Sequence, residues 1–271
     1  MHPILFKIDG ITIYTYGVIM AIAFITGYFY MLYLARVSGQ DVEFYQNLFF
    51  WIMIVGILGA KLLYIIVEWR SVFAEISFKN FISCLRGGLV WYGGVVANLV
   101  FVYFYCRKYK KSFARVADTL ASPTAVGLAI GRWGCLMAGC CYGKPTNLPW
   151  AIVYPDHPIH HPMAGIPVHP SPLYESFGAF IIALVCYEVF RRSKREGVPA
   201  ILLFLLYGVL RFFLEFFRGD PERGFIIPGK LSTSQFVSLI VVPVSIYLLI
   251  RQLKKPLSEA ETKKTKKESK K

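Results

Sequence analysis

Long apolar runs separated by short polar segments dominate the hydrophobic pattern of this chain. The runs are about 17 to 23 residues long, which is the length at which an α-helix crosses a bilayer. We therefore predict an all-α polytopic membrane protein with about seven transmembrane helices around an internal polar cavity. The expected spans are residues 13–35, 46–67, 89–106, 118–137, 174–190, 200–217 and 233–250.

The remaining segments divide the chain into a membrane domain and a tail. We expect a single transmembrane domain over residues 1–250, with an outer loop insertion at about 138–173. Residues 251–271 are rich in lysine and predict a disordered cytoplasmic tail that contacts anionic headgroups. The hydrophobic share of 56% is above that of soluble domains and agrees with this class.

The charged loops predict the orientation of the spans. Basic residues cluster in 107–115, in 191–196 and in the tail, whereas 68–86 and 218–231 mix acids with bases. The positive-inside rule then places the N-terminus outside and the C-terminus in the cytoplasm. Many of the basic residues that give the net charge of +14 lie in these segments beside the spans. The charge is therefore poor evidence for nucleic-acid binding, and we expect no nucleic-acid partner.

One apolar run carries a row of polar side chains. Arg211 lies in AILLFLLYGVLRFFLEFFR with Tyr207, Glu215 and Arg218, and at about 100° per residue these four project within one narrow sector of a helix. A charge in hydrocarbon is costly, so it normally faces a protein interior or a wet cavity. The row predicts an internal site, and its two arginines indicate an anionic ligand.

Two further cations belong to the same hypothesis. Lys61 lies inside an apolar run, and Arg132 lies near the outer end of another. We expect Arg132, Lys61, Arg211 and Arg218 to surround one anionic group, such as a phospholipid headgroup reached from the outer half of the bilayer. The glycine- and cysteine-rich stretch after Arg132 is not expected to stay regularly helical. The alternative for Arg132 is a side chain that extends to the outer headgroups.

Two other motifs have a structural and a functional interpretation. GGLVWYGG, residues 87–94, favours close helix packing over a binding role. His169 and Glu175 lie near the outer interface in VHPSPLYES. Tyrosines such as Tyr14 and Tyr16 at the start of a span are usually interface anchors.

The cysteine pattern argues against a metal centre. Cys135, Cys140 and Cys141 have C-x4-CC spacing, without the CxxC pairs or partner histidines of common zinc sites. The histidines of the outer loop are more simply explained as exposed loop residues. The chain has neither a Walker loop nor a dinucleotide fingerprint. We therefore expect no metal and no cofactor.

Six segments stand out in order along the chain: YTYG at 14–17, GAKLLY at 59–64, GGLVWYGG at 87–94, GRWGCLMAGCCYG at 131–143, HPSPLYE at 169–175 and LYGVLRFFLEFFR at 206–218. Together they resemble the prolipoprotein diacylglyceryl transferases of bacterial inner membranes. Such proteins are seven-span, multi-pass enzymes, so the resemblance implies a catalytic domain over residues 1–250. It also implies transfer of the diacylglyceryl group of phosphatidylglycerol to the lipobox cysteine thiol of a preprolipoprotein signal peptide, with release of glycerol phosphate, as the first step of lipoprotein maturation in the bilayer.

The resemblance also assigns residues. The essential arginines of the family match Arg132 and Arg211, its first-span tyrosine matches Tyr16, and the glycine that closes its signature matches Gly143. By resemblance and burial we expect catalytic roles for Arg132, Arg211, Tyr92 and Tyr16, and substrate binding by Arg132, Arg211, Gly143, Tyr207, Glu215, Arg218, Lys61 and His169.

The chain departs from the family pattern at three positions. The family often has histidine at Tyr92, asparagine at Cys135 and an acidic residue at Cys140. Histidine is a natural base near neutral pH, whereas tyrosine, with a pKa near 10, is a poor one. The identity of the general base therefore stays open. Because the acceptor thiol belongs to the substrate, Cys140 and Cys141 are not expected to be catalytic.

Two alternative functions fit a membrane protein with buried arginines. A transporter or channel for an organic anion needs such residues at the midplane, but usually shows inverted repeats, and none is evident here. A non-catalytic scaffold binds phosphatidylglycerol without turnover. Incubation with phosphatidylglycerol and a lipobox peptide distinguishes the transferase from the transporter and the scaffold, because only the transferase lipidates the peptide.

Overall fold

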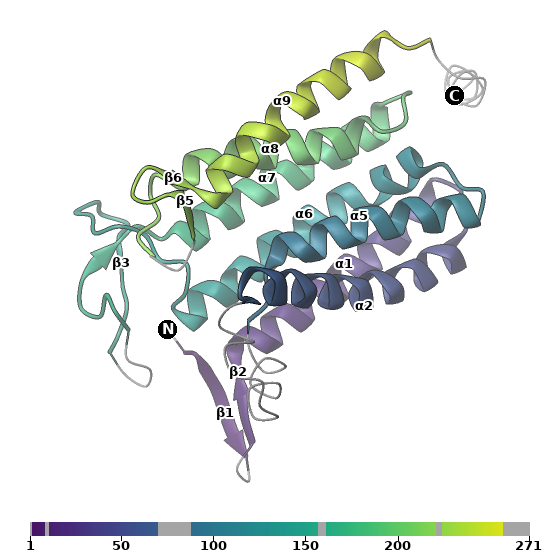
Figure 1. Ribbon diagram of the computed structural model, residues 1–271. Coiled ribbons are helices and arrows are strands. Elements are labelled where there is room, and N and C mark those ends of the chain that lie inside the picture. Colours follow the sequence, from purple (N-terminus) through teal and green to yellow (C-terminus); the bar gives the residue numbers. More distant parts are fainter. Residues whose placement is uncertain (1, 9–10, 70–87, 157–160, 221–223, 257–271) are drawn as a thin grey trace. The chain divides into compact units, whose positions relative to one another are not determined.

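The computed structural model describes residues 2–8, 11–69, 88–156, 161–220 and 224–256 (Figure 1). These residues form seven helices, and each predicted span coincides with one of them. Four helices, α1, α2, α7 and α9, are long and apolar enough to cross a membrane, and α8 is a shorter apolar helix. The helices are α1 Thr15–Val37, α2 Val42–Val67, α5 Trp91–Lys108, α6 Phe113–Ala138, α7 Ser171–Arg192, α8 Val198–Leu214 and α9 Thr233–Lys254.

Short strands accompany the helices of the predicted all-α fold. The described residues contain three two-stranded antiparallel sheets, and the second strand of each lies just before a helix. Residues 13 and 14 were expected to be helical but belong to a strand, so the first helix begins at Thr15. The pairs are β1 Ile4–Ile8 with β2 Ile11–Tyr14, β3 Ile152–Val153 with β4 Pro167–Val168, and β5 Phe225–Ile227 with β6 Leu231–Ser232.

Two other boundaries differ from the prediction. The sixth span was expected to reach residue 217, but α8 ends at Leu214. The tail was expected to be disordered from residue 251, but α9 continues to Lys254, and residues 257–271 lie outside the described part. Most of the predicted loop at 68–86 also lies outside it.

The chain forms two compact units. One contains residues 1–31 and 117–271, and the other contains residues 32–116. The single domain expected over residues 1–250 stays a prediction. In the unit of residues 32–116, α2 packs directly against α5.

Glycines explain the close approach of α2 and α5. A Cβ atom on Gly93 would lie 2.3 Å from the carbonyl oxygen of Gly59, and one on Gly94 would lie 2.8 Å from that of Gly56. Without side chains, the two backbones touch, as in other small-residue helix pairs. The packing interpretation of GGLVWYGG is therefore confirmed for its second pair of glycines.

In the larger unit, α6 packs against α7 through small side chains. The buried residues of this contact include Ala121, Ala125 and Ala183. Two hydroxyls add hydrogen bonds across it, because Ser122 Oγ donates to the Ala183 carbonyl at 2.8 Å and Ser176 Oγ donates to the Ala129 carbonyl at 2.7 Å. Small residues and hydroxyls are the usual means of joining helices in lipid, where the hydrophobic effect does not hold them together.

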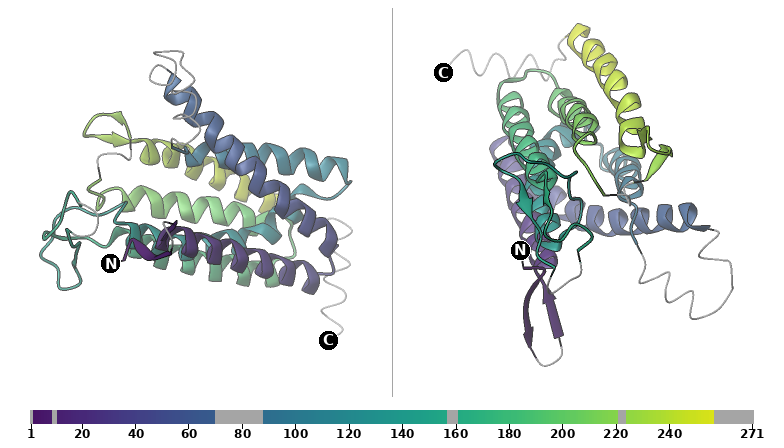
Figure 2. Two further views of the ribbon diagram at one scale, coloured as in Figure 1. Left: turned by 90° about the horizontal axis from the view of Figure 1, so that it is seen from below. Right: turned by 90° about the vertical axis from the view of Figure 1, so that its left-hand side faces the viewer.

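The helices α7, α8 and α9 lie side by side in the same unit (Figure 2). Glycines again set the spacing, since a Cβ on Gly178 would meet Leu210 at 2.5 Å and one on Gly208 would meet Val242 at 2.9 Å. The helix α9 begins with a capping box between Ser232 and Gln235. This cap sets where the first turn of α9 meets α8.

A buried carboxylate from α6 caps α8. Asp118 accepts hydrogen bonds from the backbone N–H groups of Gly197, at 2.6 Å, and Ala200, at 3.1 Å. Gly197 has a φ of +88°, a conformation that favours glycine. The negative charge lies at the positive end of the helix dipole, which stabilises it. The sequence analysis did not predict this cap.

Candidate functional site

Glu175 of α7 lies at the centre of a buried polar cluster. Its side chain is 3% exposed. Oε1 lies 2.8 Å from Nη2 of Arg132 on α6 and accepts a hydrogen bond of 2.7 Å from the Tyr207 hydroxyl on α8. Oε2 lies 3.6 Å from Nη1 of Arg211, also on α8. One carboxylate therefore holds two arginines and a tyrosine from two neighbouring helices.

Arg211 has two further partners. Its Nη2 lies 2.7 Å from Oε1 of Glu215, one helical turn further along the chain, where side chains four residues apart are neighbours. The same nitrogen donates to Ser234 Oγ of α9 at 3.2 Å. Arg211 is 9% exposed, so its charge is stable only because acidic and polar groups surround it.

Two guanidinium N–H groups of this cluster remain available to a ligand. Arg132 Nε and Arg211 Nη1 are buried and have no hydrogen-bond partner within the described part of the chain. The 3.6 Å from Arg211 Nη1 to Glu175 is too long for a hydrogen bond. Buried donors are nearly always satisfied, so these two indicate an acceptor, and the charge of the donors favours an anion.

Arg218 does not continue the row of Tyr207, Arg211 and Glu215. It was expected on the same helix, but α8 ends at Leu214 and Glu215 is its C-cap. Arg218 lies beyond the helix, where Nε and Nη2 form a fork on Asp220, with distances of 2.9 Å to Oδ1 and 2.5 Å to Oδ2. The sequence analysis did not predict Asp220 as its partner.

Gly143, His169 and Gly219 lie where three loop segments meet. The Gly143 N–H donates to the His169 carbonyl at 3.1 Å, and the Gly219 N–H donates to the Tyr142 carbonyl at 3.0 Å. A Cβ on Gly143 would lie 2.4 Å from the His169 carbonyl oxygen. Glycine is therefore required here by backbone contact, and the backbone of Arg218 pairs with that of Gly143. The predicted role of Gly143 and His169 in binding stays a prediction.

Tyr16 lies at the N-terminal end of α1, against α6. A Cβ on Gly134 would lie 3.1 Å from Cδ2 of Tyr16, and one on Gly131 would lie 3.3 Å from the sulfur of Met20. The Tyr16 side chain is 42% exposed. The fold thus brings Tyr16 close to the turn of α6 that carries Arg132.

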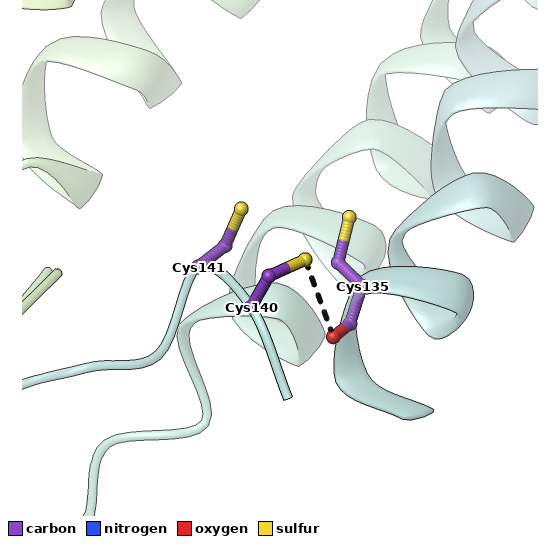
Figure 3. Close-up of side chains that lie close together, drawn as sticks. All are labelled: Cys135, Cys140 and Cys141. Carbon is purple, nitrogen blue, oxygen red and sulfur yellow. Dashed lines mark hydrogen bonds between the residues drawn. The ribbon is translucent and has the colours of Figure 1, made fainter. Parts of the chain in front are cut away.

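The end of α6 brings three cysteines together. The stretch after Arg132 was expected to lose its helical regularity, but α6 continues to Ala138 and the chain becomes irregular only from Gly139. Gly139, with a φ of +74°, then ends it, and the Cys140 N–H donates back to the Cys135 carbonyl at 3.1 Å. This is a Schellman end, which returns the chain over the last turn of the helix. As a result the sulfur atoms of Cys135, Cys140 and Cys141 lie within 4.8 Å of one another (Figure 3).

The cysteines adjoin the arginine cluster. Nη1 of Arg132 lies 3.8 Å from Cys135 Sγ and 3.9 Å from Cys141 Sγ. Hydrogen bonds with the thiols of Cys135 and Cys140, and then the charges of Arg218 and Arg132, lower the pKa of the Cys141 thiol. A lowered pKa favours the thiolate, the form that binds metals and attacks carbon.

Comparison with known proteins shows the family of the chain. The family model described as prolipoprotein diacylglyceryl transferase matches residues 3–251. The chain belongs to the prolipoprotein diacylglyceryl transferase family. It is a membrane protein, as its apolar helices indicate.

Individual members of the family are similar over nearly their full length. The phosphatidylglycerol–prolipoprotein diacylglyceryl transferase of Clostridium tetani is 34% identical, over 92% of this chain and 96% of the relative. That of Finegoldia magna is also 34% identical, over 96% of this chain and all of the relative. Transferase 2 of Clostridium perfringens is 33% identical, over 92% and 94%. The protein is accordingly a transferase.

Two of the predicted site residues lie in the unit of residues 32–116. Lys61 Nζ donates to the Gly88 carbonyl at 3.4 Å and lies 4.9 Å from the centre of the Tyr64 ring. Tyr92 packs edge-on against Trp91, with 5.6 Å between the ring centres. A catalytic role for Tyr92 and substrate binding by Lys61 stay predictions.

The sequence analysis missed the central residue of the site. Glu175 ends the HPSPLYE motif of the transferase family, yet it was placed only near the outer interface. A signal was present, because a carboxylate one turn inside an apolar run is costly unless a cation pairs with it. Arg132 and Arg211 were the available cations.

Proposed function

We propose that this protein transfers the diacylglyceryl group of phosphatidylglycerol to the lipobox cysteine thiol of preprolipoproteins. The relatives are named for this reaction. The observation that carries the proposal is that Arg132 and Arg211 share the Glu175 carboxylate while each keeps a buried N–H without a partner among the described residues. This arrangement suits a phosphate, which accepts several charge-assisted hydrogen bonds at once.

The chemistry needs such a site. The thiolate attacks the glycerol carbon that carries the phosphate ester, so a C–S bond forms and a C–O bond breaks. The electron pair of the C–O bond leaves with the phosphate, which becomes glycerol phosphate and takes up the proton that the thiol lost. Guanidinium groups held in advance by Glu175 and Glu215 stabilise the charge that develops on the leaving oxygen.

The other assigned residues support this centre. In the proposal, Tyr207 orients the Glu175 carboxylate, Glu215 orients Arg211, and Arg218, Gly143 and His169 shape the headgroup site. Substrate binding by Lys61 is a further part of the proposal. Tyr16 and Tyr92 assist the reacting groups, with Tyr92 at the position where the family often has histidine. The exposed side chain of Tyr16 beside Gly134 is consistent with contact to a substrate.

The proposal includes a place in the cell. The protein lies in the bacterial inner membrane as a single multi-pass catalytic domain of seven spans over residues 1–250. The N-terminus is outside, the C-terminus is in the cytoplasm, and phosphatidylglycerol enters an internal polar cavity from the outer half of the bilayer. The basic runs at 107–115 and 191–196 support this orientation.

The test is lipidation by the purified full-length protein. Incubated with phosphatidylglycerol and a lipobox peptide, it should produce a thioether-linked peptide and one glycerol phosphate for each peptide modified. A matched variant, Arg192→Ala, removes an exposed arginine and should leave the rate unchanged, because among the described residues Arg192 pairs with Glu188 on the same helix surface. Movement of an organic anion across vesicles without lipidation would instead identify a transporter.

A further inference from the structure

The three thiols at the end of α6 have the spacing of a metal centre. Their sulfur atoms lie within 4.8 Å of one another (Figure 3). In a tetrahedral zinc site the metal–sulfur distance is about 2.3 Å, which places the sulfurs about 3.8 Å apart. The sulfur atoms therefore need to approach one another by at most about 1 Å for all three to bind one ion. The sequence spacing argued against this, because C-x4-CC is not a common zinc pattern, but the Schellman end turns that spacing into a cluster.

The backbone holds the third cysteine in an unusual conformation. Cys141 has a φ of +60°, which costs a residue with a side chain about 1–2 kcal/mol. The Ser171 hydroxyl of α7 donates to the Cys141 carbonyl at 2.7 Å and helps to keep it there. Strained residues of this kind occur where the position of a side chain serves a function.

The surrounding charge suits three thiolates. Three cysteine thiolates and one Zn²⁺ carry a net charge of −1, and Arg132 lies 3.8 Å and 3.9 Å from two of the sulfurs. A fixed guanidinium beside the thiolates balances this charge. The same arginine also pairs with Glu175, so the thiols and the proposed phosphate site share one residue.

His161, which lies against Gly139 at the end of α6, does not complete the coordination. His161 Nδ1 accepts from the Met163 N–H at 3.0 Å, so the proton is on Nε2, which donates to the Gly139 carbonyl at 2.8 Å. Both ring nitrogens are thus engaged. Three protein ligands with a fourth position for water or substrate are the pattern of catalytic rather than structural zinc.

We propose that Cys135, Cys140 and Cys141 bind one Zn²⁺, and that the lipobox thiol of the acceptor occupies its fourth position. The binding of Zn²⁺ is argued from the geometry alone, whereas the coordination of the acceptor thiol rests on the proposed function. A thiol that coordinates zinc is deprotonated, so the ion prepares the nucleophile without a histidine base. The sulfur then forms the C–S bond as the C–O bond breaks, the departing phosphate takes up the proton, and the neutral thioether, a weaker ligand, leaves the metal.

This proposal links all three departures from the family pattern. Tyr92 stands where the family often has histidine, and cysteines stand at two positions where it often has asparagine and an acidic residue. A chain without a good general base gains another way of forming the thiolate. It also changes the expectation that Cys140 and Cys141 are dispensable.

The first experiment measures metal content. Full-length protein, purified in detergent without chelators, should contain one zinc per chain by elemental analysis. Cys140→Ser should weaken zinc binding by more than the roughly 10- to 100-fold that loss of an outer contact causes. The matched control is Cys186→Ser, because that buried thiol donates to the Pro199 carbonyl and a hydroxyl can make the same bond. Wild-type protein without zinc, or equal zinc in Cys140→Ser, overturns the site.

The second experiment tests the acceptor thiol. Protein loaded with Co²⁺ in place of zinc should show a sulfur-to-cobalt charge-transfer band, and a lipobox peptide should strengthen it. A peptide with serine in place of the lipobox cysteine should not. If the cysteine peptide leaves the charge-transfer band unchanged, the acceptor thiol does not occupy the fourth position of the metal, and this part of the proposal is overturned.

The two proposals fail in different ways. A protein that lipidates the peptide at full rate after zinc removal disproves the zinc proposal and leaves the transferase intact. A protein that binds zinc in the cysteine cluster but never lipidates disproves the proposed function and leaves the metal site.

Discussion

Nη2 of Arg132 lies 2.8 Å from Oε1 of Glu175, and this ion pair joins α6 to α7 in the interior of the larger unit. Arg132 alone would be an expensive buried cation, and Glu175 alone an expensive buried anion. Together with Arg211, they form a charged centre that is compensated and still keeps N–H groups for a ligand. The site is therefore prepared before the substrate binds, which is the condition for electrostatic catalysis.

The first prediction concerns Arg211. Arg211→Ala and Arg211→Lys should each lower the lipidation rate about a hundredfold, or by about 3 kcal/mol of transition-state stabilisation. Lysine keeps the charge but cannot contact Glu215, Ser234 and a phosphate with one planar group. The rates are compared at equal membrane levels, with Arg192→Lys as the control. A near wild-type rate in Arg211→Ala would make Arg211 a structural ion pair only.

The second prediction concerns Glu175. Glu175→Gln keeps the shape but removes the charge that holds two arginines, and breaking a buried pair costs about 3–5 kcal/mol. We expect a marked fall in thermal stability in detergent as well as loss of lipidation. Glu188→Gln is the control, because its exposed pairs with Arg191 and Arg192 contribute at most about 1 kcal/mol. Equal melting temperatures for the two variants would contradict the central role of Glu175.

The third prediction separates stability from activity. Asp118→Ala removes the cap of α8 and leaves the N–H groups of Gly197 and Ala200 without their acceptor. The expected loss is about 1–3 kcal/mol of stability. At low temperature the folded variant should lipidate at a near wild-type rate, since Asp118 bonds the opposite end of α8 from Arg211. A specific loss of rate with unchanged melting would show that Asp118 acts on the site.

The fourth prediction concerns the contact between α2 and α5. Gly93→Ala places a Cβ 2.3 Å from the carbonyl oxygen of Gly59, which forces the helices apart. Overpacking of this kind costs about 1–3 kcal/mol. Gly17→Ala is the matched control, because its Cβ meets no atom within 4 Å. Gly93→Ala should therefore melt at a lower temperature than Gly17→Ala. Equal melting temperatures would mean that the two backbones do not touch.

The fifth prediction concerns orientation. A reporter enzyme that is active only in the periplasm, fused after Lys271, should be silent, because the basic runs at 107–115 and 191–196 predict a cytoplasmic C-terminus. The same reporter fused before the first span should be active. A strong signal from the C-terminal fusion would overturn the predicted number of spans.

The sequence by itself determined the helices and one ion pair. Apolar runs of sufficient length predict helices because in lipid the backbone must satisfy its own hydrogen bonds. Each of the seven expected spans coincides with a described helix. The pair of Arg211 and Glu215 was equally predictable, because residues four apart on a helix are neighbours whatever surrounds them.

Local signals were also present for features that the sequence analysis missed. Gly139 after the last apolar turn of α6 is typical of a Schellman end, which places Cys140 over Cys135. The two- and three-residue strands give too short a pattern to be detected. Arg218 was misplaced because the end of α8 was set three residues too late, at 217 instead of Leu214.

Only the tertiary structure decided that Arg132, Glu175 and Arg211 share one site. These residues come from three helices, and their contact depends on how α6, α7 and α8 pack. That packing is set by small residues such as Ala125 and Gly178, whose effect is to let helices approach, without specifying which partner they approach. The sequence therefore indicated the burial of Arg211 and Glu215, because both lie inside an apolar run, whereas the burial of Glu175 and Asp118 was not predicted. Which charges meet is a property of distant segments, and the tertiary fold alone decides it.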